Sequence, residues 1–182
     1  MSDIQHIGIV GAGRMGKAIA IAFAYAGLNI KLIDAKDRDQ PDFLAYEDKI
    51  NTEIQQELNL LEKINFIQPQ QSMLVQQRIH ILAKEESRAF LTACDLIMEG
   101  VPEQKEAKQQ IFSWLDQYIP KHCIVASTTS TFLVTDIAAM LSAPERVINA
   151  HWLNPAYLMP LVELSRTEQT SEQVISRLKT FL

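Results

Sequence analysis

Short apolar runs alternate along the chain with longer stretches in which apolar residues recur at helical spacing. Apolar runs of this length, separated by helices, are typical of the buried strands of a parallel sheet. The predicted strands span residues 6–10, 29–34, 78–82, 96–99, 123–127, 146–150 and 161–164. The alternation predicts an α/β domain with a mostly parallel sheet.

Helical spacing fills several of the segments between these strands. Residues 14–26 are apolar almost all round, which predicts a helix buried against the sheet. Further helices are expected within 103–118 and 133–141. Residues 171–182 have the pattern of an amphipathic helix and contain neither Gly nor Pro.

One region interrupts the alternation. Residues 35–77 are polar and compatible with helix, and Leu58, Leu61 and Ile64 are spaced to share one helical face. Eight acidic and four basic side chains fall between positions 35 and 63. We therefore expect a largely solvated helical hairpin inserted between the second and third strands.

The composition fits one folded domain over residues 1–182. Apolar residues make up 47% of the chain, and the net charge is −5 without any basic cluster, which argues against a nucleic-acid surface. No apolar segment is long enough to span a bilayer. Cys94 and Cys123 are too few and too far apart in sequence for a metal site or a disulfide framework. We expect reduced thiols, a cytoplasmic location and no metal.

A glycine-rich turn follows the first predicted strand and opens the first predicted helix. It has the G-x-G-x-x-G pattern of dinucleotide-binding domains, and the predicted cofactor contacts are Gly11, Ala12, Gly13, Arg14, Met15 and Gly16. Gly11 permits the tight turn, Gly13 lets the backbone approach a pyrophosphate, and Gly16 lets helix and strand pack closely. The turn predicts a Rossmann-like, doubly wound sheet that binds a dinucleotide at the start of this helix.

An acidic residue, Asp34, ends the second predicted strand. In dinucleotide-binding domains such a residue accepts hydrogen bonds from the hydroxyls of the adenosine ribose. Its charge would repel a 2′-phosphate, which favours NAD over NADP as the cofactor. Lys36 and Arg38 follow closely, and their positive charges leave NADP open.

One histidine and one carboxylate, His151 and Glu163, lie in the otherwise apolar stretch 149–164. Oxidation of an alcohol needs a base that titrates near neutral pH, and the imidazolium that forms needs a carboxylate partner. The ends of the strands would place both groups beside the cofactor. From the residues alone, His151 beside Trp152 is also compatible with a core histidine, and Glu163 with the exposed residue of an edge strand.

The order of these motifs resembles that of the 3-hydroxyacyl-CoA dehydrogenase family. After the glycine turn, Asp34 and the helical insert come Glu99-Gly-Val-Pro-Glu103 with Lys108, Ser127-Thr-Thr-Ser130-Thr131, and His151-x-x-Asn154-Pro155 with Glu163 downstream. The resemblance covers essentially the whole chain, as the N-terminal NAD-binding domain of that family. The last two blocks are specific, because Rossmann domains in general do not carry them.

The resemblance implies a role for each of these side chains. His151 would be the general base, Glu163 would orient it, and Ser130 would hydrogen-bond the reacting oxygen and touch the cofactor. Contacts with NAD are implied for Glu103, Lys108 and Asn154. From the residues alone, Ser130 is also compatible with a helix cap, Glu103 with a first-turn carboxylate and Lys108 with a solvated helix face.

Two features of the sequence are compatible with either of two substrates, a 3-hydroxyacyl-CoA or a CoA-free hydroxy acid. The insert offers Glu53, Glu57 and Glu62 where the family usually offers lysines to coenzyme A. Residues 154–163 also resemble the relatives that oxidise CoA-free hydroxy acids, such as carnitine and gulonate dehydrogenases. A non-catalytic NAD-binding module is a third interpretation.

In the family, an all-helical C-terminal domain follows the NAD-binding domain. It supplies an active-site asparagine, part of the substrate wall and most of the dimer interface. The resemblance implies that the 182 residues stop before the last strand of the sheet and before this second domain. We therefore expect the chain to bind NAD but to turn over poorly on its own.

Overall fold

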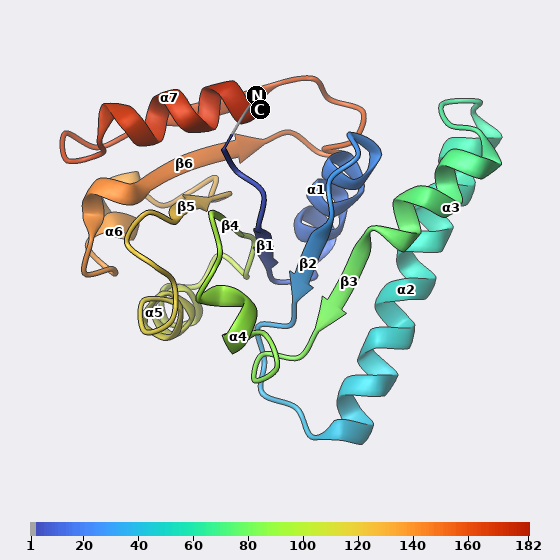
Figure 1. Cartoon of the computed structure of the whole chain (residues 1–182), viewed down its shortest axis with the longest axis horizontal. Coiled ribbons are helices and arrows are strands. Elements are labelled where there is room, and N and C mark those ends of the chain that lie inside the picture. Colours follow the sequence, from blue (N-terminus) through green and yellow to red (C-terminus); the bar gives the residue numbers. More distant parts are fainter. Residues whose placement is uncertain (1–2) are drawn as a thin grey trace.

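Seven strands form one sheet in the order β3-β2-β1-β4-β5-β6-β7, as the computed structural model of residues 3–182 shows (Figure 1). The strands are β1 Ile7–Val10, β2 Ile30–Ile33, β3 Ile79–Leu82, β4 Leu96–Glu99, β5 Ile124–Ser127, β6 Val147–Trp152 and β7 Val162–Ser165. All neighbouring pairs are parallel except the last, in which β7 runs antiparallel to β6. The sheet confirms the predicted Rossmann-like, mostly parallel architecture.

Helices cover both faces of the sheet. They are α1 Arg14–Tyr25, α2 Gln40–Lys63, α3 Pro69–Gln77, α4 Arg88–Leu91, α5 Lys105–Leu115, α6 Val134–Ala138 and α7 Glu172–Phe181, with a 3₁₀ turn at Pro144–Arg146. Alternate strand residues point to opposite faces. Ile9 and Leu32 pack in one core with α1, α2, α3 and α7, whereas Val10 and Ile33 pack in a second core with α4, α5 and α6.

Helix α1 is the buried helix that the sequence predicts. Most of its residues are covered, and it lies against the sheet beside β1 and β2. Helix α7 is amphipathic as expected and buries Val174 and Leu178 against the same face.

The insert is a helical hairpin, formed by α2 and α3 beside the β3 end of the sheet (Figure 1). Asp39 caps α2 by accepting a hydrogen bond from the Asp42 N–H at 2.9 Å. The predicted apolar face was partly wrong, because Ile64 is 54% exposed and follows the last helical residue. Asn65, with φ of 57°, ends the helix in the left-handed conformation. The buried face consists of Phe43, Ile50, Ile54, Leu58 and Leu61.

Several element boundaries differ from the prediction. The helix expected over 103–118 spans only Lys105–Leu115, because Gln104 is its extended N-cap residue and Asp116 its C-cap residue. Strand β6 continues past the predicted end at 150 to Trp152, since β7 pairs with it along that length. The short helix α4 was not predicted, because four residues carry too little periodicity to be detected.

Candidate active site

The glycine turn brings β1, α1 and the end of β4 into close contact. Gly11 adopts a φ of +100°, and a side chain there would lie 2.8 Å from the Gly100 carbonyl oxygen. A side chain at Gly16 would collide with the carbonyl oxygen of Gly11. Only glycine fits at these two positions, which confirms the predicted packing role of Gly16.

The start of α1 is open to an anion. Gly13 is the N-cap residue; it offers no side-chain cap, and the first turn contains no acidic residue. A side chain at Gly13 would meet only the Gly100 oxygen, at 3.9 Å. The first N–H groups of the helix are therefore available to the pyrophosphate of a dinucleotide.

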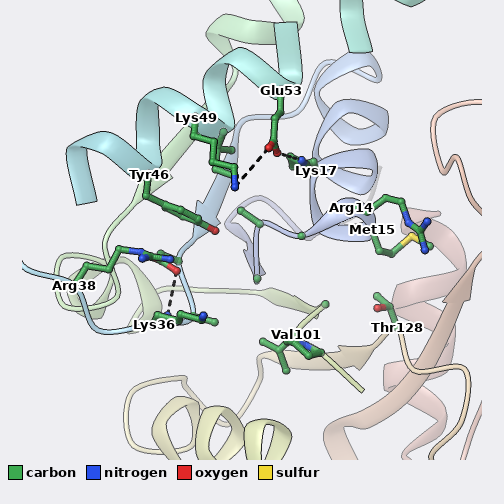
Figure 2. A pocket seen from close by; sticks show the side chains of 18 of the residues that line it. Arg14, Met15, Lys17, Lys36, Arg38, Tyr46, Lys49, Glu53, Val101 and Thr128 are labelled. Atoms are coloured by element: carbon green, nitrogen blue, oxygen red, sulfur yellow. Dashed lines mark hydrogen bonds and ion pairs between the residues drawn. The ribbon is translucent and has the colours of Figure 1, made fainter. Parts of the chain in front are cut away.

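A cavity of about 950 Å³ extends from this turn across the end of β2 to the insert helix α2. Figure 2 shows Tyr46, Lys49 and Glu53 projecting from α2 towards the glycine turn, with Lys17 of α1 paired to Glu53. The predicted cofactor residues on its wall are Gly11, Ala12, Gly13, Arg14, Met15, Asp34, Glu103 and Ser130. The volume lies at the upper end of the usual range for small-molecule sites.

Asp34 lies at the far end of this cavity and is already hydrogen-bonded. Only 2% of the residue is exposed. Its Oδ1 accepts from the backbone N–H of Lys36 at 3.1 Å, and its Oδ2 accepts from Nε of Arg38 at 2.5 Å. The Arg38 guanidinium lies 4.1 Å from the centre of the Tyr46 ring. Burial, and then the charge of Asp34, raise the pKa of Tyr46 to about 12, so its hydroxyl stays protonated.

His151 and Glu163 form a hydrogen-bonded pair across the hairpin of β6 and β7. The antiparallel register sets them directly opposite each other, and Nδ1 of His151 lies 2.8 Å from Oε2 of Glu163. On the other side of the ring, Nε2 lies 3.1 Å from Oγ of Ser130. Since Ser130 also lines the cofactor cavity, the pair lies next to that cavity.

Glu103 holds the turn that carries Ser130. Its Oε1 accepts from the Ser130 N–H at 3.1 Å, while its Oε2 accepts from the hydroxyls of Thr129 at 2.8 Å and Thr131 at 3.1 Å. Glu103 therefore fixes the position of Ser130 relative to His151.

A buried polar network lies behind this turn. Nζ of Lys108 contacts both oxygens of Glu99 at 3.0 Å, and the Ser127 hydroxyl donates to Glu99 Oε2 at 2.6 Å. The Val101 N–H also donates to Glu99. Glu99 and Lys108 are 0% and 1% exposed, so Lys108 is not a solvated helix face. No role was predicted for Glu99, although a carboxylate at the end of an apolar strand can indicate a buried partner.

A family model described as the NAD-binding domain of 3-hydroxyacyl-CoA dehydrogenase matches residues 6–182. The chain belongs to the 3-hydroxyacyl-CoA dehydrogenase family. NAD is the cofactor of this domain.

Relatives of known name agree with this membership. The chain is 33% identical over 174 residues to a glyoxysomal fatty acid beta-oxidation multifunctional protein MFP-a of Cucumis sativus, covering 95% of this chain and 22% of the relative. It is 33% identical over 171 residues to a probable 3-hydroxybutyryl-CoA dehydrogenase of Bacillus subtilis. The match covers 94% of this chain and 56% of the relative. The crystal structure of (S)-3-hydroxybutyryl-CoA dehydrogenase PaaH1 from Ralstonia eutropha superposes with a TM-score of 0.86 at 32% identity. The superposition covers 98% of this chain and 60% of that enzyme. The chain thus spans between about a fifth and three fifths of these relatives.

Two of the predicted NAD contacts of this 3-hydroxyacyl-CoA dehydrogenase domain lie off the wall of the cavity. Asn154 is exposed, precedes a cis bond to Pro155, and makes no side-chain hydrogen bond to residues 3–182. Lys108 lies beneath the wall of the cavity, 3.8 Å from Glu103 Oε2. Neither residue lines the cavity itself.

Other polar side chains of the dehydrogenase domain lie away from the cavity. His6 and His122 each approach one oxygen of Asp95 at 3.4 Å. Cys94 and Cys123 are buried free thiols. Within residues 3–182, no cluster of His, Cys, Asp and Glu has the makings of a metal site. No helix in this range is both long and apolar enough to cross a membrane.

Proposed function

We propose that this chain is the NAD-binding domain of an enzyme that oxidises the 3-hydroxyl of a 3-hydroxyacyl-CoA to a ketone. The observation that carries the proposal is the hydrogen-bonded series Glu163–His151–Ser130, which reaches the wall of the cofactor cavity. A base held by a carboxylate on one side and open to a hydroxyl on the other is what alcohol oxidation requires.

The proposed roles follow from this geometry. His151 accepts the hydroxyl proton of the substrate at Nε2, and Glu163 accepts the Nδ1–H and stabilises the imidazolium that results. Ser130 donates a hydrogen bond to the reacting oxygen and contacts the cofactor. NAD, when bound, supplies the hydride acceptor.

The residues around the cavity would hold the cofactor. The glycine turn and the start of α1 receive the pyrophosphate, and Asp34 contacts the adenosine ribose. Glu103 acts through the turn that carries Ser130. Direct contacts of Lys108 and Asn154 with NAD stay predictions; for Lys108 the observed partner is Glu99.

A CoA-free hydroxy acid is the second candidate substrate, and the charge of the insert supports it. Helix α2 exposes few cations for the phosphates of coenzyme A, and Glu53 is bonded to Lys17 and Glu57 to Tyr157. A non-catalytic NAD-binding module is the third candidate. The two free thiols favour a cytoplasmic location of the enzyme. From the family resemblance, the complete enzyme would dimerise through a C-terminal helical domain.

The deciding experiment measures NADH formation by the complete enzyme with 3-hydroxybutyryl-CoA, carnitine and gulonate. We expect kcat/KM for 3-hydroxybutyryl-CoA to exceed kcat/KM for carnitine or gulonate by at least about a hundredfold, since the CoA moiety supplies binding energy. Preference for a free acid would support the second candidate. NAD binding without turnover of any substrate would support the third.

A further inference from the structure

We propose that the adenosine end of the cavity also accepts the 2′-phosphate of NADP(H), and that Arg38 is the residue that determines this specificity. The inference rests on dinucleotide binding at the glycine turn and goes beyond it. The site would take both cofactors, with the phosphate beside Arg38.

The charge of Asp34 is compensated within the protein. An acidic residue at this position discriminates against NADP because it repels a 2′-phosphate. Here the carboxylate is 2% exposed and bonded to the Arg38 guanidinium at 2.5 Å. The adjacent Arg38 cation opposes the field of this carboxylate where a phosphate would lie. The main cause of discrimination is therefore weakened.

Arg38 is also held in a position to bind the phosphate. It contacts Asp34 through Nε and also hydrogen-bonds the Tyr46 side chain, which leaves the remaining N–H groups of its planar fork for other acceptors. Tyr46 supports the guanidinium, whose central carbon lies 4.1 Å from the ring centre. The side chain is 25% exposed and belongs to the lining of the cavity. Ordering it in advance lowers the entropic cost of binding a phosphate.

A second cation lies on the same loop. Lys36 is exposed, lines the cavity and forms no ion pair with any residue in the range 3–182. Lys49, also on the wall, lies 3.9 Å from Glu53. The acidic Asp42 lines the cavity as well, so the end of the cavity is not uniformly positive. Arg38 and Lys36 are the cations placed beside the ribose-binding carboxylate.

The test is a set of dissociation constants, measured by isothermal titration calorimetry, for NAD⁺ and NADP⁺ and for the fragments AMP and 2′,5′-ADP. For the wild-type chain we expect Kd values for NAD⁺ and NADP⁺ within about tenfold of each other, because the Arg38 charge opposes the repulsion by Asp34. Arg38→Ala should raise the Kd ratio of NADP⁺ to NAD⁺ by about ten- to a hundredfold, the usual worth of a hydrogen bond to a charged group. The fragment pair should show the same change.

Arg88→Ala is the matched control. Arg88 also contacts a carboxylate, Glu85, and lies 5.4 Å from an aromatic ring, that of Tyr118, but it is outside the cavity. Its loss should leave the ratio unchanged. Arg38→Lys, which keeps the charge without the planar fork, should restore part of the NADP⁺ affinity.

Two results would overturn the inference: a wild-type Kd for NADP⁺ more than a hundredfold above that for NAD⁺, or a ratio that Arg38→Ala changes by less than threefold. Either result with normal NAD⁺ binding would leave the proposed function intact. Absence of NAD⁺ binding by the wild-type chain would instead contradict dinucleotide binding at the glycine turn.

Discussion

His151 contacts a different partner through each ring nitrogen, Glu163 at Nδ1 and Ser130 at Nε2. In the complete enzyme, His151→Ala should lower kcat by about a hundred- to ten-thousandfold, the usual contribution of general-base catalysis. The Kd for NAD should change by less than about twofold, because the imidazole lies outside the cavity that binds the cofactor. Stopped-flow absorbance of NADH and calorimetry measure the two quantities. A large loss of NAD affinity would contradict the role as base.

At this scale the sequence predicted the chemistry better than the contacts. His151 and Glu163 could be paired in advance because a general base needs a carboxylate partner and both residues lie at the ends of predicted strands. The contact of Arg38 with Tyr46 could not be predicted, since it depends on how α2 lies beside the loop that follows β2. The buried contacts of Lys108 could not be predicted for a similar reason. The position of a lysine on an amphipathic helix does not indicate that its partner is buried on a neighbouring strand.

The ion pair between Glu99 at the end of β4 and Lys108 on α5 joins two elements in the interior. Lys108→Met should lower the free energy of unfolding by about 3–5 kcal/mol, because it leaves the Glu99 carboxylate buried without a counter-charge. Urea titration followed by circular dichroism measures the loss. The double variant Glu99→Leu/Lys108→Met should recover much of it. A single variant as stable as the wild type would show that the pair contributes nothing to the fold.

A second connection between elements joins the end of α5 to the turn before β6. Burial alone would raise the pKa of Asp116, but hydrogen bonds from Ser142 and the Arg146 guanidinium lower it below its ordinary value. A carboxyl whose pKa is depressed by folding stabilises the fold above its unfolded pKa of about 3.9, and this stability is lost as the pH falls through the folded pKa.

Asp116→Asn should therefore lower the unfolding free energy at pH 5–7, and the difference from the wild type should shrink below about pH 4. Urea denaturation at a series of pH values measures it. Asp136→Asn, an exposed aspartate on α6, is the control and should have little effect. A difference for Asp116→Asn that is constant down to pH 2 would contradict the assignment.

Hydrophobic periodicity predicted which segments form helices and which form strands, whereas tertiary packing decided the residues at which each helix or strand ends. The strand pattern at 146–150 stopped short of Trp152 because the extension depends on pairing with β7, which lies later in the chain. The α2 face was misread at Ile64 because Asn65 terminates the helix, and no glycine or proline marks that end.

At the scale of the whole molecule, the cofactor cavity touches α1, the end of β2 and the insert, so a bound dinucleotide links separate parts of the domain. NAD at about a hundred times its Kd should stabilise the folded chain by ~2.7 kcal/mol, raising Tm by about 5–10 °C for a domain of this size. Differential scanning calorimetry measures the shift. His151→Ala should keep it and Asp34→Ala should lose most of it; an equal shift in both variants would argue against ribose binding by Asp34.

The hairpin of β6 and β7 sets His151 opposite Glu163 through backbone pairing alone. The exposed residues 158–161 of the connecting segment can therefore change while the acid–base couple stays in register, whereas Ala156 and Tyr157 of the same segment pack against the core. Substitutions at these exposed positions could admit a bulkier or more polar alcohol without changing the catalytic pair. Engineering for new hydroxy substrates would begin at these exposed residues.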